Sequence, residues 1–311
     1  MKFAIAFGLI LAAATSVAAQ HSSKSVYPDV MRFDHAAAGT AETFQALFTA
    51  KSRHDVDGTM RFFSPNLTTY TNSTWGWPLD GYAALQGTFA TFMPKWPATG
   101  LSYPIRVIGG PDSALVEFVD TKELFGSELR VFGVVDLKGG KVVRWVDYWD
   151  SNTIPSQLDG QFRTPKNKFP KDYKDSAVGD NASPRITDMS RRLQAALAAN
   201  DPTAAAALFS NEATLEDRTL RTQLVTRAAI ERYLVRAAPL VPYAAGARIR
   251  HIVGGDLGGG YEWVSASWAD HGVMALELDE AGLITRASVL YDGRALPARD
   301  RTRLTELGLE K

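Results

Sequence analysis

The sequence predicts two consecutive domains of the α+β class, each a cone with a curved, mainly antiparallel sheet and helices packed on one face. Three observations support this. The chain has 311 residues, which suits two domains of ordinary size. Helical and strand patterns occur twice in the same order. A polar stretch at 153–184, rich in Lys, Asp, Pro and Asn, separates the copies, so we expect domains at 38–152 and 185–296.

The first copy begins with segments whose apolar residues have helical spacing and continues with β-branched and alternating segments. Pro94 ends the third helix. The expected helices are Ala41–Lys51, Asp57–Phe63 and Gly81–Met93, and the expected strands are Asn66–Asn72, Ser102–Ile108, Ala114–Leu124, Glu128–Leu137 and Lys141–Tyr148.

Short matches between the copies support a tandem repeat. The segment Phe44–Leu47 is echoed by Leu193–Leu197. The closing strand Val142–Asp150 resembles Ile284–Asp292. Two copies of one unit are the simplest interpretation.

The first nineteen residues have the pattern of a secretory signal peptide. Lys2 precedes the apolar run Phe3–Ala13, and Val17–Ala19 places small residues before Gln20. This run is too short for a membrane span, and no later stretch approaches spanning length. We therefore expect a secreted or periplasmic protein.

Composition excludes several function classes. The 34 basic and 34 acidic residues balance, so the positive surplus typical of nucleic-acid binding is missing. The chain has no cysteine, so its cores must stabilise it without disulfides. Its five histidines lack metal-ligand spacing, and we expect neither a metal nor another cofactor.

The strand that closes the first copy carries the strongest functional signal. Side chains on a strand alternate between its faces. Asp147 therefore shares one face with Trp145 and Trp149, and Arg144 and Tyr148 lie on the other. Burial between tryptophans should raise the pKa of Asp147 toward values useful for proton transfer.

The order of elements, together with the closing strand at Trp145–Asp150, resembles the SnoaL-like and ketosteroid-isomerase-like superfamily. Within it, about residues 40–152 are most similar to limonene epoxide hydrolase. Tyr70 and Asn72 match the Tyr-x-Asn that holds the attacking water in that family, Asp120 falls at its acid and Asp147 at its base. The resemblance implies a cofactor-independent enzyme.

One position departs from the family. The family has an arginine two residues before the acid, between the two carboxylates, and this chain has Phe118 there. Alternation places Phe118, Asp120 and Lys122 on one strand face. Lys122 is the candidate for the missing cation, although a lysine cannot clasp two carboxylates as an arginine does. The alternative, which we favour, is a solvated lysine at the strand end.

The expected chemistry uses four side chains. Asp147 takes a proton from water or from an acidic carbon, Asp120 gives one to the oxygen that develops negative charge, and Tyr70 and Asn72 hold the nucleophile. Aromatic residues would line a pocket for a small hydrophobic molecule that bears a few oxygens. The candidates for this lining are Trp75, Trp77, Phe89, Phe92, Trp96, Phe118, Trp145 and Trp149.

The second copy does not keep this set. Val289 stands at the position of Asp147, and Trp268 falls near the position of the acid. Glu216 and Arg218 take the places of the Tyr-x-Asn pair. We expect the second domain to pack against the first as an internal pseudo-dimer partner.

Alternatives remain at this stage. The enzyme would hydrolyse an epoxide or carry out isomerisation, cyclisation or elimination. The rival functions are a non-catalytic hydrophobic-ligand-binding protein and a tandem scaffold. Asp147 could be a structural aspartate that pairs with Arg144, and Trp75, Phe89 and Phe92 could be plain core.

Overall fold

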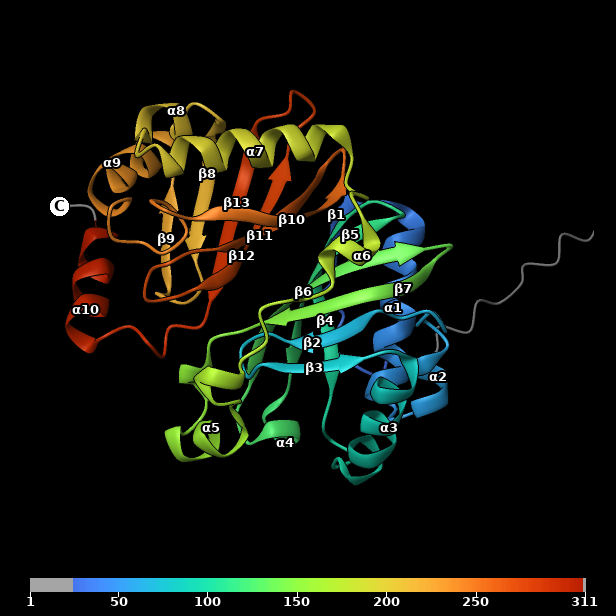
Figure 1. Cartoon of the computed structure of the whole chain (residues 1–311). Helices are drawn as coiled ribbons and strands as arrows, with labels where there is room; N and C mark the ends of the chain where they lie inside the picture. Colours follow the sequence, from blue (N-terminus) through green and yellow to red (C-terminus); the bar gives the residue numbers. More distant parts are fainter. Residues whose placement is uncertain (1–24, 310–311) are drawn as a thin grey trace, which may run out of the picture.

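The structure, a computed structural model, describes residues 25–309, so the expected signal peptide at 1–19 lies outside the described residues. Within this range the strands form two mixed sheets, one in each half of the chain (Figure 1). The α+β class predicted from the sequence is confirmed. Below, the first half is residues 25–152, the linker is 153–184 and the second half is 185–309.

The sheet of the first half has the strand order β1-β4-β5-β6-β7-β2-β3. Most neighbours are antiparallel, but β1 runs parallel to β4 and β2 runs parallel to β7. The elements are β1 Arg32–Ala36, α1 Ala38–Ser52, α2 Val56–Met60, β2 Thr69–Asn72, β3 Trp77–Asp80, α3 Tyr82–Phe92, β4 Ser102–Gly109, β5 Ser113–Asp120, α4 Lys122–Phe125, β6 Leu129–Lys138 and β7 Lys141–Tyr148.

The sheet of the second half repeats this frame with the order β10-β11-β12-β13-β8-β9, and β13 runs parallel to β8. The helix α7 lies along one face of this sheet (Figure 1). The elements are α7 Pro184–Ala198, α8 Pro202–Ala206, β8 Phe209–Asp217, β9 Thr222–Val225, α9 Arg227–Ala237, β10 Arg248–Gly255, β11 Gly258–Val264, β12 His271–Leu278, β13 Ile284–Tyr291 and α10 Ala298–Leu307.

One predicted strand is wrong at its end. The sequence predicts a strand to Leu124, but β5 stops at Asp120 and Thr121 precedes the short helix α4. Lys122 therefore lies on α4, where it is exposed, and not on the strand face of Asp120. The strand alternation that placed Lys122 beside Asp120 does not extend that far.

The linker is more ordered than its composition suggests. It contains the helices α5 Ser156–Phe162 and α6 Asp175–Val178 and short 3₁₀ turns, and it packs on both halves. Arg163 illustrates this, because its guanidinium donates to the Thr74 carbonyl of the first half and to Asp292 of the second. These contacts tie the linker to the surface of both sheets.

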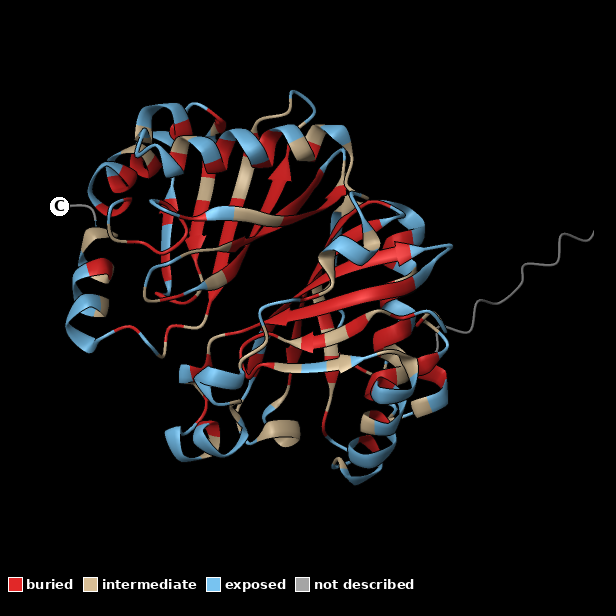
Figure 2. Ribbon diagram, viewed as in Figure 1, coloured by how far each residue is buried: buried red, intermediate tan, exposed pale blue. Residues whose placement is uncertain are grey.

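Each half has its own apolar core between the sheet and its helices, and a third buried cluster joins the two sheets (Figure 2). Such burial is the main favourable term in packing two sheets face to face. The members of the third cluster are Ile108, Leu115, Phe132, Val134, Val146, Tyr148, Tyr173, Val253, Val273, Ala275 and Leu290.

Buried ion pairs accompany this apolar contact. Arg144 of β7 is fully buried and reaches Glu262 of β11 at 2.7 Å and Asp136 of β6 at 3.3 Å. The other carboxylate oxygen of Glu262 accepts from Tyr148. His251 of β10 lies 2.9 Å from Asp136. Because each buried charge has a partner of opposite sign, the network satisfies groups that would otherwise be costly to bury.

A second network lies farther along the same contact. Arg106 of β4 bonds Glu117 of β5 at 2.9 Å and Glu277 of β12 at 2.7 Å. Arg218, in the turn after β8, reaches Glu117 at 3.0 Å and Glu216 at 3.1 Å. Both networks thus link residues of the first half to residues of the second.

Candidate active site in the first half

Asp147 lies on the β7 face that points into the first core. Its carboxylate is only 7% exposed and accepts hydrogen bonds from Tyr70 Oη at 2.7 Å and Trp145 Nε1 at 2.5 Å. The parallel pairing of β2 with β7 places Tyr70 beside Trp145, and their rings stack at 5.7 Å. Burial raises the pKa of Asp147 to about 6, although the two hydrogen bonds oppose this rise.

The hydrogen bonds distinguish between the two sequence-based interpretations of Asp147. Arg144, the alternative partner, lies on the opposite face and pairs with Asp136 and Glu262. The alternation predicted for β7 is therefore present, and Asp147 belongs to the core side of the sheet. Whether its role is catalytic stays a prediction.

The cation next to Asp120 is Lys51, which the sequence analysis missed. Lys51 Nζ lies 3.4 Å from Asp120 Oδ1, and both side chains are 9% exposed. The ammonium also sits 4.9 Å from the centre of the Phe118 ring, within range of a cation–π contact. Its charge lowers the pKa of Asp147, so Lys51 acts electrostatically on both aspartates.

A signal for Lys51 was present in the helix pattern. The buried residues of α1 include Phe44, Leu47 and Phe48, and Lys51 continues this face at helical spacing. A lysine on the core side of an amphipathic helix is unusual, because lysines are almost never buried without a partner. The cation beside Asp120 therefore comes from the helix α1, and not from the strand that carries Phe118.

Asn72 lies directly across from Asp147 in the register of β2 and β7. Its Oδ1 accepts from the Trp75 backbone N–H at 3.0 Å and from Trp149 Nε1 at 3.1 Å. The first bond closes a turn after the strand, which is a common use of Asn. The side-chain oxygen of Asn72 therefore holds local structure.

The predicted lining residues divide into two groups. Phe118, Trp145 and Phe89 are buried in the first core, where Trp145 packs against Phe118 at 6.2 Å and Phe89 packs against Tyr70 at 6.1 Å. These side chains surround the aspartates. They leave an apolar environment with Lys51 and the two carboxylates as its charged groups.

Trp75, Trp77 and Trp149 form a second aromatic group, with edge and tilted contacts. Trp75 packs on Trp149 at 5.0 Å and on Trp77 at 4.9 Å, and its Nε1 donates to Asp159 of α5. These contacts bind the linker helix to the β2–β3 turn. These tryptophans therefore stabilise the packing of the linker on the first half.

Phe92, a predicted lining residue, and Lys122, the candidate cation, do not lie at the site. Phe92 is 52% exposed at the end of α3, because its position on the helix turns it away from the sheet. Lys122 is exposed on α4, as described above. Trp96 is half-buried and contacts His54 and Phe125.

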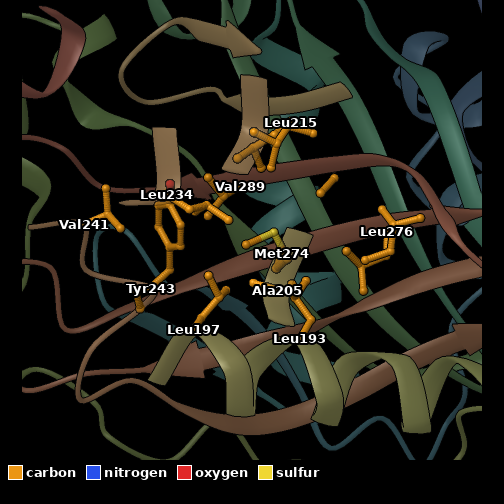
Figure 3. Close-up of a cluster of buried hydrophobic side chains, with 14 of the residues drawn as sticks. Leu193, Leu197, Ala205, Leu215, Leu234, Val241, Tyr243, Met274, Leu276 and Val289 are labelled. Carbon is orange, nitrogen blue, oxygen red and sulfur yellow. The ribbon is translucent and has the colours of Figure 1, made fainter. Parts of the chain in front are cut away.

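The second half has no carboxylate at the position of Asp147. Strand register puts Val289 opposite Asp217, as Asp147 is opposite Asn72, and Ala287 opposite Leu215, as Trp145 is opposite Tyr70. Figure 3 shows Val289 and Leu215 within the apolar cluster of this half. The counterparts of Tyr70 and Asn72 are thus Leu215 and Asp217.

This register corrects the sequence-based assignment of Glu216 and Arg218 to those places. Because side chains alternate, an alignment one residue out moves every side chain to the other face. Trp268 is likewise not at the acid position. It follows β11 in a loop and packs on Tyr291 at 5.4 Å.

Neither a metal cluster nor a spanning helix is found in the part of the chain that the structure describes. No three His, Asp or Glu residues among residues 25–309 are placed to hold a metal ion. No helix in that range is both long and apolar enough to cross a membrane.

No family model matches this chain, and no curated protein matches it. Solved structures that match include a protein with a cystatin-like fold from Silicibacter pomeroyi, with 20% identity over 40% of this chain and 82% of that chain and a TM-score of 0.32. A putative ketosteroid isomerase from Kribbella flavida has 18% identity over 42% and 85%, with a TM-score of 0.31. A hypothetical protein with a ketosteroid-isomerase-like fold from Catenulispora acidiphila, in complex with trimethylamine, has 16% identity over 42% and 98%, with a TM-score of 0.33.

These neighbours are described as cystatin-like or ketosteroid-isomerase-like, and others are described as NTF2-like or SnoaL-like. Each spans only part of this chain, and none is described as a limonene epoxide hydrolase. Likeness at this level assigns no function.

Proposed function

We propose that the first half is a cofactor-independent acid/base catalyst that acts on a small, mostly apolar molecule bearing oxygen, with Asp147 as the base. The observation that carries this proposal is the buried Asp147 carboxylate, whose pKa burial raises to about 6. A base with a pKa near neutrality is largely ionised at pH 7 yet still basic enough to take a proton from carbon or water. Perturbed groups of this kind cluster at functional sites.

Each neighbour has a role in the proposed reaction. Tyr70 and Trp145 hold the Asp147 carboxylate in one orientation through their hydrogen bonds. Lys51, on the same side of the sheet, stabilises negative charge that develops on a substrate oxygen. Asp120 holds the Lys51 ammonium group in place through their ion pair. Asp147 returns the proton that it took to a second atom of the same substrate, so the carboxylate is regenerated at the end of the reaction.

Isomerisation by proton transfer fits this arrangement better than epoxide hydrolysis. Hydrolysis requires Tyr70 and Asn72 to hold a water molecule. Tyr70 instead donates to Asp147, and the Asn72 oxygen takes two donors from Trp75 and Trp149. A proton shuttle within one substrate needs no held water, which favours an isomerase or a related lyase, with epoxide opening as the second reaction class.

A non-catalytic hydrophobic-ligand-binding protein is the alternative function. The packing of the first core favours it, because Phe44, Phe48 and Phe63 all contact Trp145. In such a protein the aromatic side chains would rearrange around an apolar ligand. The carboxylate would then serve only to orient a polar end of that ligand.

The test is turnover of a panel of enolisable ketones and epoxides by the whole chain and by Asp147→Asn. We expect the variant to lose about 100-fold or more of the rate, the usual contribution of a general base. Asp217→Asn is the matched control, since it changes the same group in the second half and should keep full rate. Equal rates for all three proteins, with ligand binding retained, would support the binding protein instead.

We also propose that the halves form an internal pseudo-dimer and that the chain is exported. A chain ending at Asn152 should be much less stable than the whole chain or should self-associate. If it is monomeric and equally stable, the pseudo-dimer idea fails. Export predicts a mature N-terminus at Gln20 when the protein is collected outside the cytoplasm.

A further inference from the structure

A cavity of about 800 Å³ lies between the two halves, on the side of the first sheet opposite to Asp147. Phe132 of β6 and Leu290 of β13 contribute its apolar wall, and both belong to the buried cluster that joins the sheets. Arg218 and Arg221 line it from the turn between β8 and β9. Its volume is that of a small-molecule site, and such sites often lie between domains.

The two arginines have no counterpart in the first half. The equivalent turn, between β2 and β3, carries Ser73 and Gly76. Ser73 N–H donates to the Asp147 carbonyl at 3.0 Å, and Arg218 N–H donates to the Val289 carbonyl at 2.9 Å, which aligns the two turns. Three residues later, Gly76 has φ 72° and Arg221 has φ 57°.

Arg221 therefore adopts a left-handed backbone conformation, and the equivalent residue of the first half is a glycine. This conformation costs a residue with a Cβ about 1 kcal/mol, and strained residues of this kind cluster at functional sites. Arg221 makes no ion pair with another residue in the described range 25–309 that would offset the cost. Arg221 is exposed at the cavity, so its guanidinium is accessible to a ligand.

Arg218 also has a hydrogen-bond donor that is free to bind a ligand. Its Nη2 is shared between Glu117 and Glu216, but its Nε is buried without a hydrogen-bond partner among the described residues. The two carboxylates are already neutralised from behind, Glu117 by Arg106 and Glu216 by Arg286. The other charged residues of the lining are Lys122 and Arg130, which are basic, and Glu128, Asp150 and Asp217, which are acidic. An incoming anion can therefore reach the free Nε of Arg218 and the guanidinium of Arg221 without displacing the ion pairs of Glu117 and Glu216.

On the other side of the contact, linker side chains pack between the β2–β3 turn and the start of β12. The Phe169 ring approaches within 2.6 Å of the place where a Cβ on Gly76 would lie. The rings of Phe169 and Tyr173 lie 6.0 and 5.9 Å from His271. Aromatic side chains therefore pack against the β2–β3 turn, whereas the equivalent turn between β8 and β9 borders the cavity.

We propose that this cavity binds a small organic carboxylate with a ring or short apolar chain, its carboxylate on Arg218 and Arg221 and its apolar part against Phe132 and Leu290. Arginine suits this task because its planar fork matches a carboxylate. The site is separate from the proposed active site, since it lies on the other face of the first sheet. It needs both halves, because the arginines come from the second and most of the opposing wall from the first.

Calorimetric titration of the full chain with phenylacetate tests the proposal, and phenylacetamide serves as its neutral match. We expect saturable binding of phenylacetate with a Kd of about 1 mM or tighter, and binding of the amide about tenfold weaker. Arg221→Gly should weaken phenylacetate binding about tenfold, the loss of one charge-assisted contact. This variant should fold, since glycine occupies the equivalent position in the first half.

Asp147→Asn is the control for the other site and should leave phenylacetate binding unchanged. Amide chemical shifts of residues 218–223 should change on titration, and those of β7 should not. The proposal is overturned if phenylacetate shows no saturable binding, if the amide binds equally well, or if Arg221→Gly binds as tightly as the unchanged chain. Loss of binding in Asp147→Asn also overturns it, because the probe would then occupy the first core.

Discussion

The two halves share one framework but put different residues into it, and the difference separates structural from functional groups. Asn72 and Asp217 occupy the same register position. Asp217 bonds the Leu220 N–H at 2.8 Å and accepts from the Tyr291 hydroxyl at 2.9 Å, as Asn72 bonds its own turn and strand-end aromatic. These contacts persist in a half without Asp147, so they belong to the fold.

Other groups occur in one half only. Asp147, Trp145 and Tyr70 are replaced by Val289, Ala287 and Leu215. The second half thus lacks both the carboxylate and the two side chains that donate hydrogen bonds to it. This joint absence is expected, because the three side chains depend on one another. A buried carboxylate without its donors would be strongly destabilising.

The largest expected effect compares Glu262 with Glu117, which hold equivalent places on β11 and β5. Glu262 and Arg144 are fully buried, and the linker carbonyl of Tyr173 also binds Arg144. We expect Glu262→Gln to cost about 4 kcal/mol of unfolding free energy, because it strips a buried charge of its main partner. Denaturant unfolding monitored by tryptophan fluorescence measures it.

Glu117→Gln should cost less, about 1 to 2 kcal/mol. Arg106 keeps Glu277 as a partner, and Arg218 is one-third exposed at the cavity, where water can solvate it. Equal losses for the two variants would contradict the idea that Arg144 and Glu262 are sealed from water while Arg218 is open to it.

The next effect concerns pH and the buried acid of the first half. Since burial raises the pKa of Asp147 from 3.8 to about 6, its protonated form is favoured in the folded state. The contribution of Asp147 to the free energy of unfolding is therefore fully present below pH 4, and it is lost as the pH rises toward 6. The difference between 3.8 and about 6 corresponds to about 3 kcal/mol.

Asp147→Asn should abolish that loss of stability between pH 4 and 6, which denaturant midpoints measured across the range would reveal. Asp217→Asn provides the comparison. Burial raises the pKa of Asp217 to about 7. The loss of stability caused by ionisation of Asp217 therefore extends to higher pH, and it should remain in Asp147→Asn. A profile that is unchanged in Asp147→Asn would mean that the carboxylate is solvated.

The smallest effect compares the two turns. Arg221→Gly should stabilise the chain by about 1 kcal/mol, because it relieves a left-handed conformation. Gly76→Ala should instead destabilise it by about 2 kcal/mol, through the same strain and through collision with Phe169. Thermal unfolding of both variants measures the contrast, and a destabilised Arg221→Gly would show that the arginine holds the fold together.

Much of the framework was predictable from the sequence. Alternation around Trp145 and Asp147 placed β7 with its bounds and put Arg144 on the opposite face. Apolar spacing located α1 and α3 within a few residues. Such patterns indicate which face of a segment is buried, and burial of that face determines where the helix or strand forms.

The remainder depends on tertiary contacts that local patterns do not encode. The strand β1 is mostly exposed and shows no alternation, and β3 is short and includes Pro78. Lys51 was missed because a helix pattern reports apolar residues, while its partner Asp120 lies 69 positions away. The counterparts of Tyr70 and Asn72 were placed one residue out because similarity in this part of the repeat is too weak to fix the register.

The linker, whose Phe169 packs between Gly76 and His271, also joins the two halves covalently. Sheet therefore meets sheet within a single chain, at an effective concentration set by a tether of about thirty residues and not by the amount of protein present. The contact forms as a first-order step, so dilution cannot separate the halves. Two identical subunits would have to keep the same sequence on both sides of such an interface. This chain is free of that requirement, and its halves can hold different residues at every equivalent position.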